Sequence, residues 1–491
     1  MSLAPPPPAH PTPPIFPKRV VSSRLTHFLA WFLMSLVVLT MVLLNYLGSQ
    51  ITATSPTEDS APLGAEFQML GKVLIGAQKA GVSDGLLQGQ LIALKPVTLE
   101  DRLAKVILQE QFGDLEDALD SLELIEVDRD DPERDLSEVR RRLLDDVSVL
   151  LRARASGEPA AALNEDSSAR LKRLLPFYGP LLEAQATHDQ PALDQLQTSA
   201  MTALFVLLGV GFWYLLAFGC GGVFLLCFLL SIWVPGLKGF RTLLFDPRGS
   251  TGSVYMETFG LWLLAFFGLS FLTEFVMMFT GLGLRFPELN LVGSLIAMFA
   301  SLFVLYWPRI RGVTSTQLRL HCGLYKANLL KEIGCGFLIY TTAIPLLLCG
   351  LMISQVLIFL IELLFGTQPP PSHPVTDLLE GSAFGLVLVY LIACVGAPIV
   401  EEIMFRGVLY RYLRECSRGF GLVVSFVFSA LISSFIFAAV HPQGIAFIPV
   451  LGALAVGFCL GREWRGSLVA PMVAHAVNNV VTVTLGLMLL G

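Results

Sequence analysis

The stretch Ala397–Gly407, APIVEEIMFRG, places two adjacent carboxylates and an arginine directly after an apolar run that begins at Ala383. Ionisable side chains are costly at membrane depth and usually mark a functional site. In a helix, Glu402 and Arg406 stand four positions apart and share a face, which predicts a structural ion pair. Glu401 points elsewhere and has no obvious countercharge. A buried carboxyl of this kind suits a general base, so Glu401 is the first catalytic candidate.

The composition is that of a polytopic membrane protein. Of the 491 residues, 54% are hydrophobic and 34 are Phe, and the mean hydropathy is +0.67. Chains of this kind place most of their residues in a bilayer. We therefore expect an all-α bundle of about nine transmembrane helices. Their predicted positions are 28–48, 202–233, 254–280, 289–307, 334–365, 382–410, 421–440, 444–461 and 467–490.

The negative charge is concentrated in one segment. Residues 49–200 hold 15 of the 33 basic and 27 of the 39 acidic residues, which leaves 18 and 12 for the rest of the chain. Apolar residues recur there at helical spacing, over 99–125 and again over 136–151. The segment contains no cysteine, so disulfides do not stabilise it. We expect a soluble, acidic helical domain inserted after the first span.

Basic residues predict the orientation in the membrane. Residues 1–27 form a Pro-rich, basic tail before the first span at 28–48, which indicates a cytoplasmic N-terminus. A cleaved signal peptide is the alternative, but the apolar run is too long for one and lacks a clean cleavage site. One crossing then puts 49–200 outside the cytoplasm, where a protein ligand can bind it. Residues 201–491 form the multi-span domain of a cell-membrane protein.

The basic residues are scattered through short loops, which argues against a nucleic-acid partner. The predicted partners are the lipid bilayer and a protein or lipidated peptide. Two acids of the third span, Glu257 and Glu274, are interpreted as lone structural side chains.

His441 closes the motif Phe437-x-x-x-His441, one helical turn after the phenylalanine. A helical hairpin that turns near Gly419 brings His441 back to nearly the depth of Glu401, since each arm rises ~27–33 Å at 1.5 Å per residue. The two side chains can therefore be neighbours.

His475 and Asn479 stand four positions apart and share one face of the last span. His475 follows Gly466 by only nine residues, a rise of ~14 Å. To reach Glu401, either the turn before the last span is sunk into the protein or the spans tilt. The sequence leaves both options open.

Other interpretations of these polar residues exist. A single intramembrane His or Asn is often only a helix–helix hydrogen-bonding group. A Glu with two His also resembles a catalytic zinc set. The absence of HExxH spacing, and an amide at Asn479 that is suited to donate, favour a site without metal, with zinc as the alternative. A non-catalytic membrane scaffold or bacteriocin-immunity protein is the alternative of another class.

Three motifs in this order, Glu401-Glu402-x-x-x-Arg406, Phe437-x-x-x-His441 and His475-x-x-x-Asn479, resemble those of the CPBP family, the type 2 CaaX prenyl endopeptidases and their bacteriocin-processing relatives. The resemblance covers about residues 382–485. It implies an eight-helix core with a conical cavity open toward the cytosol and the membrane. It also implies an intramembrane endopeptidase that hydrolyses membrane-associated or lipidated, CaaX-type proteins without a cofactor.

The resemblance also implies roles for the individual residues. Glu401 would be the general base, and His441 would help to orient and activate the attacking water. His475 and Asn479 would stabilise the oxyanion. The supporting positions would be Glu402, Arg406 and Phe437.

Overall fold

The computed structural model describes residues 23–54, 63–129, 136–234, 251–324, 328–365 and 382–490, apart from positions 64, 95, 97, 114, 158, 161 and 162. All regular structure in these ranges is helical, and nine of the helical segments are long and apolar enough to cross a membrane. The chain is therefore an all-α, multi-pass membrane protein. The predicted tail lies outside the described residues up to position 22.

Each predicted span corresponds to an observed one; most ends differ by a few residues, but the second span begins at Gln190 instead of at 202. Eight of them are α1 (Arg24–Thr54), α9 (Gln190–Trp233), α11 (Val254–Thr280), α13 (Pro287–Ser301), α16 (Leu329–Phe365), α21 (Leu422–Ala439), α22 (Ile448–Arg465) and α23 (Val469–Leu490). Span α13 is extended by η2 (Leu302–Tyr306) and α14 (Trp307–Ile310). The remaining span, between α16 and α21, consists of α18 (Ala383–Tyr390), η3 (Leu391–Gly396), α19 (Ala397–Glu401), η4 (Glu402–Leu409) and α20 (Tyr410–Cys416).

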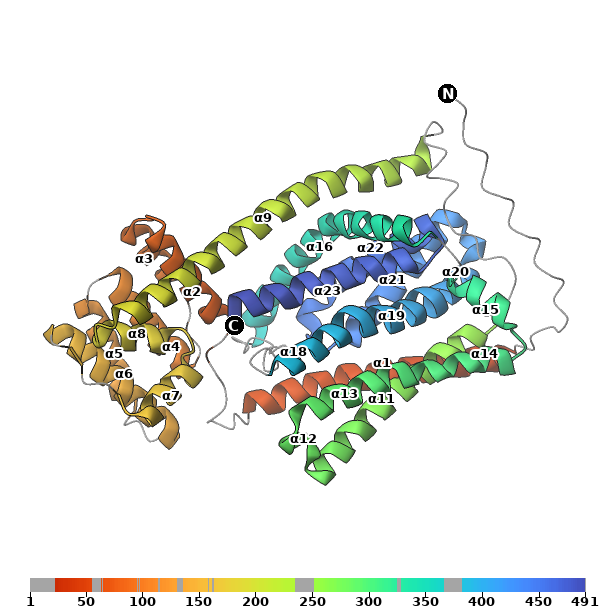
Figure 1. Ribbon diagram of the computed structural model, residues 1–491. Helices are drawn as coiled ribbons and strands as arrows, with labels where there is room; N and C mark the ends of the chain where they lie inside the picture. Colours follow the sequence, from red (N-terminus) through yellow and green to blue (C-terminus); the bar gives the residue numbers. More distant parts are fainter. Residues whose placement is uncertain are drawn as a thin grey trace.

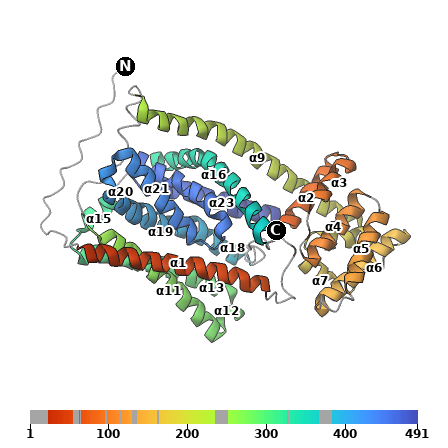
Figure 2. The same cartoon turned by 180° about the vertical axis from the view of Figure 1, so that it is seen from behind.

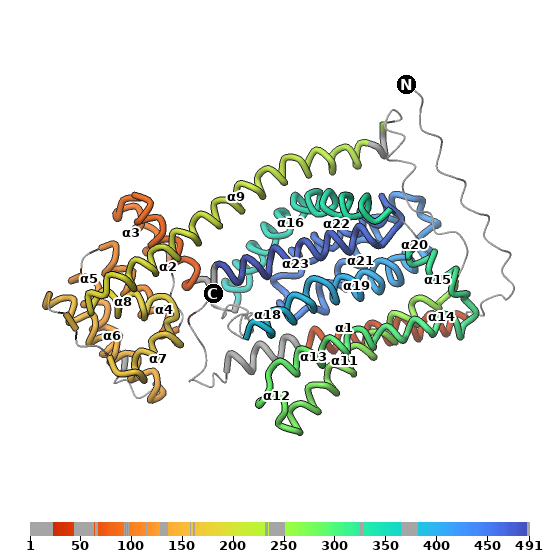
Figure 3. The backbone as a smooth tube through the Cα atoms, in the orientation of Figure 1, coloured from red at the N-terminus to blue at the C-terminus, as the bar shows by residue number. Residues whose placement is uncertain are grey.

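Short helices join the spans. They are α12 (Leu282–Arg285), α15 (Ser315–Cys322), η5 (Arg418–Phe420) and η6 (Ile445–Phe447). In Figures 1 and 3, the span that runs from α18 to α20 lies between two groups of helices, with α1, α11 and α13 on one side and α16 and α21 to α23 on the other. Figure 2 shows α1 from behind, running along α11.

Small residues let the helices of the second group approach closely. A Cβ added at Gly457 of α22 would meet Ala343 of α16, and one added at Gly461 would meet Ile339. Contacts of this type replace the hydrophobic effect as the main attraction between helices in a bilayer. They fix α22, which reaches the candidate site, against the long helix α16.

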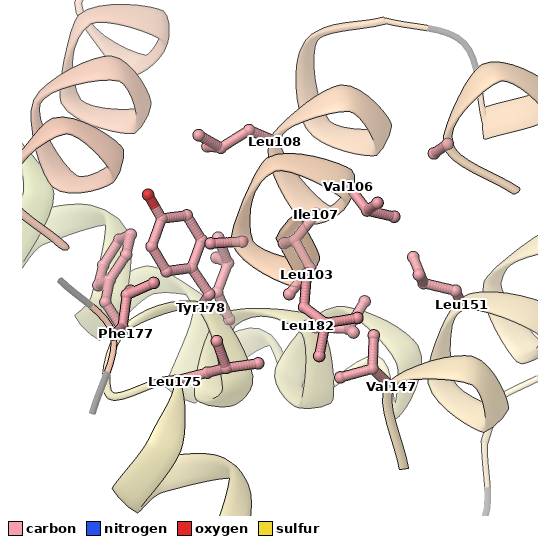
Figure 4. Close-up of a cluster of buried hydrophobic side chains, with 14 of the residues drawn as sticks. Leu103, Val106, Ile107, Leu108, Val147, Leu151, Leu175, Phe177, Tyr178 and Leu182 are labelled. Atoms are coloured by element: carbon pink, nitrogen blue, oxygen red, sulfur yellow. The ribbon is translucent and has the colours of Figure 1, made fainter. Parts of the chain in front are cut away.

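Seven helices lie between the first two spans, in the segment predicted to be a soluble domain and called the soluble domain here. They are α2 (Ala65–Lys79), α3 (Asp84–Ala93), α4 (Leu99–Phe112), α5 (Leu115–Arg129), α6 (Glu138–Ser156), α7 (Glu165–Leu174) and α8 (Tyr178–Ala186). Figure 4 shows their common apolar core, in which Leu103, Val147 and Leu182 are completely buried. The buried hydroxyl of Tyr178 donates a hydrogen bond of 2.6 Å to the carbonyl of Phe67. The helical character expected for 49–200 is thus present in its described part.

Helix α9 joins the soluble domain to the membrane bundle without a break. Its 44 residues begin with the Asp189 side chain accepting a hydrogen bond from the Ala192 N–H. Helix α2 packs along the first part of α9 (Figure 1). At 1.5 Å per residue α9 is ~66 Å long, and its far end packs Phe228 on Phe426 of α21. The boundary predicted between 200 and 201 therefore falls inside one continuous helix.

Candidate active site

The span that carries the glutamate pair alternates between α- and π-helical turns. Helix α19 is five residues long and lies between the π-helical segments η3 and η4. In η3, the Ala397 N–H bonds to the carbonyl of Ile392, five residues back, instead of to that of Ala393. The next possible donor, Pro398, has no N–H. Asn479 supplies the missing donor, with its Nδ2 at 2.7 Å from the Ala393 oxygen.

The carboxylate of Glu401 faces both histidines that the sequence singles out. Its Oε2 lies 3.9 Å from Nε2 of His441 and 3.9 Å from Nε2 of His475. These distances are too long for direct hydrogen bonds and suit a bridging water. The side chains of Glu401 and His441 are 17% and 23% exposed, and that of His475 is 5% exposed. The three groups therefore converge at one partly enclosed point.

The partners of the other ring nitrogens assign the tautomers. Nδ1 of His441 lies 2.5 Å from the carbonyl oxygen of Phe437, and Nδ1 of His475 lies 3.0 Å from Oε1 of Glu402. Both partners only accept hydrogen bonds, so each Nδ1 carries the hydrogen. Each Nε2 then faces Glu401, as an acceptor when its ring is neutral and as a donor when the ring is protonated.

The structure contains the ion pair that the spacing of Glu402 and Arg406 predicts. Nη1 of Arg406 lies 2.8 Å from Oε1 of Glu402, and both side chains are completely buried. Nη2 of Arg406 donates to the Ala455 carbonyl at 3.2 Å. The guanidinium also lies 4.6 Å and 5.1 Å from the ring centroids of Phe437 and Phe458. These contacts compensate the buried charge and fix the carboxylate that holds His475.

Phe458 is an aromatic contact of the site that the sequence does not single out. The imidazole of His475 stacks on it at 5.1 Å and 22°, and meets the edge of Phe437 at 5.9 Å. The only signal for Phe458 in the sequence is its place in the predicted span 444–461. Its role depends on how α22 is rotated, which the sequence does not give.

His475 reaches the glutamates because the turn before α23 is sunk into the protein. Arg462 and Glu463, in the last turn of α22, are completely buried, and so is Leu468. The N–H of Leu468 donates to the carbonyl of Gly323 at 3.2 Å. The sequence leaves open a sunk turn before the last span or tilted spans. The structure shows the sunk turn.

Asn479 lies beside the backbone of the span that carries the glutamates. Its described hydrogen bonds join Nδ2 to the Ala393 carbonyl and Oδ1 to Nδ2 of Asn478, the latter at 3.1 Å. They connect it to η3, and the oxyanion role that the resemblance implies for it stays a prediction. One hydrogen of the Nδ2 group is thus committed to the backbone of the span that carries the glutamates.

Glu401, His441 and His475 are residue types that can also bind a metal ion together. Zinc bound tetrahedrally at ~2.0 Å would bring the ligand atoms to ~3.3 Å from one another, against the 3.9 Å found here. In the described part of the chain, no group of three or more His, Cys, Asp and Glu side chains is arranged to hold a metal ion. Both histidines do have an oxygen partner at Nδ1, as zinc-binding histidines commonly have. Metal removal is therefore a necessary test.

The fold and this site define a multi-pass membrane protein with a glutamate and two histidines at one point between its last four spans. Residues 383–481 match the family model of the type II CAAX prenyl endopeptidases, Rce1-like, so the chain carries a domain of this family. The family is one of proteases, and the match supports an intramembrane protease.

A relative named as the membrane-embedded CAAX protease MroQ, from Staphylococcus aureus (strain USA300), is 31% identical over 93 residues. The aligned part is 19% of this chain and 36% of that protein, so the chain matches about a third of the relative's length. No solved structure matches the chain. The soluble domain lies outside the matched part.

Proposed function

We propose that this protein is an intramembrane endopeptidase in which Glu401 activates a water molecule for attack on a peptide carbonyl. The observation that supports it most is the position of Glu401 Oε2, 3.9 Å from Nε2 of both His441 and His475. A water at this point can give one hydrogen to Glu401 while its second hydrogen is held by a histidine nitrogen. Oε2 is buried and has no hydrogen-bond partner among the described residues, so it is available for this contact.

The reaction would proceed in two proton-balanced steps. Glu401 takes a proton from the water as its oxygen attacks the carbonyl carbon, and His441 Nε2 holds the second hydrogen. The negative charge that develops on the carbonyl oxygen is stabilised by the N–H of protonated His475, whose charge Glu402 compensates from the Nδ1 side. The intermediate collapses when Glu401 passes its proton to the leaving nitrogen. Base catalysis of this kind contributes ~10²–10⁴ in rate, and one oxyanion donor ~10²–10³.

The substrates would be membrane-associated proteins or lipidated peptides. The similarity to a membrane-embedded CAAX protease supports CaaX-type substrates. We further propose a cell-membrane location with a cytoplasmic N-terminus, which places the soluble domain, residues 49–200, outside the cytoplasm. The domain would then bind a protein ligand or the substrate itself.

The test compares membrane fractions from cells that make the wild-type protein with fractions from cells that make Glu401→Gln. Mass spectrometry of new peptide termini reports products without a guess at the substrate. We expect termini that are present with the wild type and absent with the variant. Identical termini in both, with the two proteins equally abundant, would favour the scaffold alternative.

A further inference from the structure

A groove lies between α9, α16 and α22, apart from the candidate active site. Helix α9, which runs along α16 (Figure 1), contributes Phe224 and Phe228 from one of its faces. Helix α16 contributes Leu338, Ile339 and Thr342. The lining of the groove is almost entirely apolar, and the groove is partly open to its surroundings.

Helix α22 has one face toward this groove and another toward the candidate active site. Its groove residues follow one another at intervals of three, one and three positions: Gly457, Leu460, Gly461 and Trp464. Ala455 and Phe458 are three positions apart on the other face, where they contact Arg406 and His475. A molecule in the groove would therefore pack against the helix that supports the site without touching the site itself.

Two close contacts between helices end the groove on the side away from Trp464. A Cβ added at Gly221 of α9 would meet the carbonyl of Thr341, and one added at Gly457 would meet Ala343. From Gly457 to Trp464, α22 rises ~10 Å, against ~15 Å for one leaflet of the hydrocarbon core. The groove thus has a blind end, and its length suits the greater part of one acyl chain.

The mouth of the groove carries polar groups that suit the surface of a bilayer. Trp464 is an aromatic residue of the kind that prefers this depth, where its indole N–H can donate a hydrogen bond. Lys331 lies seven residues before Leu338 on the same face of α16, ~10 Å further toward the helix start. Glu332 beside it is paired with Arg465 at 2.5 Å.

Lys331 places a positive charge at this mouth. Its side chain is exposed and makes no ion pair with another residue of the described chain. Basic side chains at the membrane surface attract anionic lipid head groups, and basic pockets between transmembrane helices bind them. The charge at the mouth and the apolar lining behind it therefore match the two parts of an anionic phospholipid.

The groove also lies where phospholipid is the surrounding medium. Phe224 at its rim is 41% exposed, and Leu226 and Leu229 nearby on α9 are 55% and 47% exposed. Side chains of this kind on a membrane span face acyl chains and not water. A lipid whose phosphate is level with Lys331 has its acyl chains at the depth of the groove.

We propose that the groove between α9, α16 and α22 is a binding site for one anionic phospholipid, with an acyl chain in the groove and the phosphate at Lys331 and Trp464. The bound lipid would join α22 to α9, the helix that continues from the soluble domain. The inference concerns lipid binding and not proteolysis, so it stands or falls independently of the proposed function.

The test is photo-crosslinking of the full-length protein in phosphatidylcholine vesicles that contain phosphatidylglycerol with a diazirine in one acyl chain. Peptide mapping after illumination locates the modified residues. We expect the groove residues of α16 and α22 to be labelled in excess over Phe271 and Phe275, which are exposed on α11 and contact bulk lipid. Labelling of the groove that does not exceed that of α11 would show boundary lipid only and would overturn the proposal.

A substitution that fills the groove should remove the excess labelling. Leu338→Trp places a larger side chain in the lining, and Leu330→Trp, at a position 82% exposed on the same helix, is the matched control. We expect the excess to disappear in Leu338→Trp and to remain in Leu330→Trp. An excess that remains in a folded Leu338→Trp protein would contradict the site.

Lys331→Ala tests the head group without a change in the lining. A single lysine near an anionic lipid surface contributes about fivefold in affinity, so the probe content of the membrane at half-saturation should rise about fivefold. Arg319→Ala removes an exposed basic residue of α15 and should keep the wild-type value. Half-saturation that is unchanged in Lys331→Ala would overturn the proposed position of the phosphate.

Competition distinguishes a bilayer lipid from a lipidated substrate as the occupant. Unlabelled phosphatidylglycerol should reduce the excess labelling, and a farnesylated peptide should leave it unchanged. Phosphatidylglycerol should also raise the midpoint temperature of thermal unfolding of the delipidated protein in detergent, because a ligand of the folded state stabilises it. Displacement by the farnesylated peptide alone would assign the groove to a prenyl chain and overturn the proposal.

Discussion

His475 and Glu402 are joined by a hydrogen bond of 3.0 Å between Nδ1 and Oε1, although 73 residues separate them along the chain. The same Oε1 accepts from Nη1 of Arg406 at 2.8 Å. The second glutamate of the pair therefore links the ion pair that spacing predicts to the histidine that completes the site. The two adjacent carboxylates have different surroundings, because Glu401 faces Nε2 of His441 and of His475 while Glu402 holds Arg406 and Nδ1 of His475.

We predict that Glu402→Ala destabilises the protein strongly. Removing one partner of a completely buried ion pair leaves Arg406 uncompensated, which costs about 3–5 kcal/mol. Denaturant unfolding in detergent measures the change. Glu138→Ala is the matched control, since its pair with Arg142 has the same four-residue spacing but is 61–67% exposed. A pair of that kind contributes about 0.3–0.5 kcal/mol, so equal losses in the two variants would contradict the prediction.

Replacement of His441 and of His475 should affect the stability of the protein differently. His441→Ala is expected to lower kcat by ~10²–10⁴ with little loss of stability, because the ring is part-exposed and its Nδ1 bonds to a carbonyl only one turn back in the chain. His475→Ala should lower both activity and stability, since it is buried against Phe458 and bonded to Glu402. Activity and thermal unfolding are measured on the same preparations. Equal stability losses would show that His441 is structural.

We predict that the stability of the fold decreases at acid pH because of His321. Burial, followed by the nearby charges of Arg411 and Arg462, lowers the pKa of His321 from 6.5 to about 3. Nδ1 of the ring is hydrogen-bonded to the Tyr255 hydroxyl at 2.7 Å. The unfolded chain takes up this proton below pH 6.5 and the folded chain does not, so the contribution to stability is complete above pH 6.5 and is lost as the pH falls toward 3.

The midpoint temperature of thermal unfolding of the wild type should therefore decrease as the pH is lowered from 7 to 4.5. His321→Gln should make this decrease with pH smaller. The exposed His188→Gln is the control and should keep the wild-type slope. A His321 variant with an unchanged pH dependence would show that other groups cause the acid sensitivity.

Metal removal distinguishes the mechanism in which Glu401 activates a water molecule from the alternative of a zinc-dependent protease. We expect dialysis against a chelator to leave activity unchanged, since Glu401 and the two histidines form the proposed site without a metal ion. Elemental analysis of the purified protein before and after dialysis is the second readout. Activity that is lost on dialysis and restored by zinc, with one zinc per chain, would establish the alternative.

Several parts of the structure could be predicted because they depend on local spacing. The nine spans follow from hydropathy along the chain. The pair Glu402–Arg406 follows from four-residue spacing in a helix, which the π-helical turn of η4 preserves. The equal depth of Glu401 and His441 follows from the lengths of two helices that turn near Gly419. In each case the feature follows from hydropathy or spacing along the chain, without contacts between distant segments.

Other parts depend on contacts between segments that are distant in sequence. Glu257 was interpreted as a lone acid, which is wrong: Arg311 lies 3.1 Å from it, and the indole of Trp307 donates to it at 2.9 Å. Both partners are fifty or more residues away, so no helical spacing reveals them. The stacking of Phe458 on His475 and the sunk turn before α23 are of the same kind, since each depends on how whole helices are packed.

The π-helical turns around α19 are a third kind of feature. Pro398 is visible in the sequence, but a proline near the middle of a span can kink, break or only locally widen a helix. The widened turn is stable here because Asn479 satisfies the carbonyl that it leaves free. That donor comes from another helix 86 residues away. The role of Asn479 in η3 therefore needed the structure.

The most direct test of a water activated by Glu401 is hydrolysis of a substrate found by the membrane-fraction comparison, carried out by the purified protein in H₂¹⁸O. With the wild type we expect one ¹⁸O atom in the new carboxyl group after a single turnover, and with Glu401→Gln a loss of at least ~10² in rate while the protein remains folded. Cleavage by Glu401→Gln at the wild-type rate, or products without ¹⁸O, would contradict the mechanism.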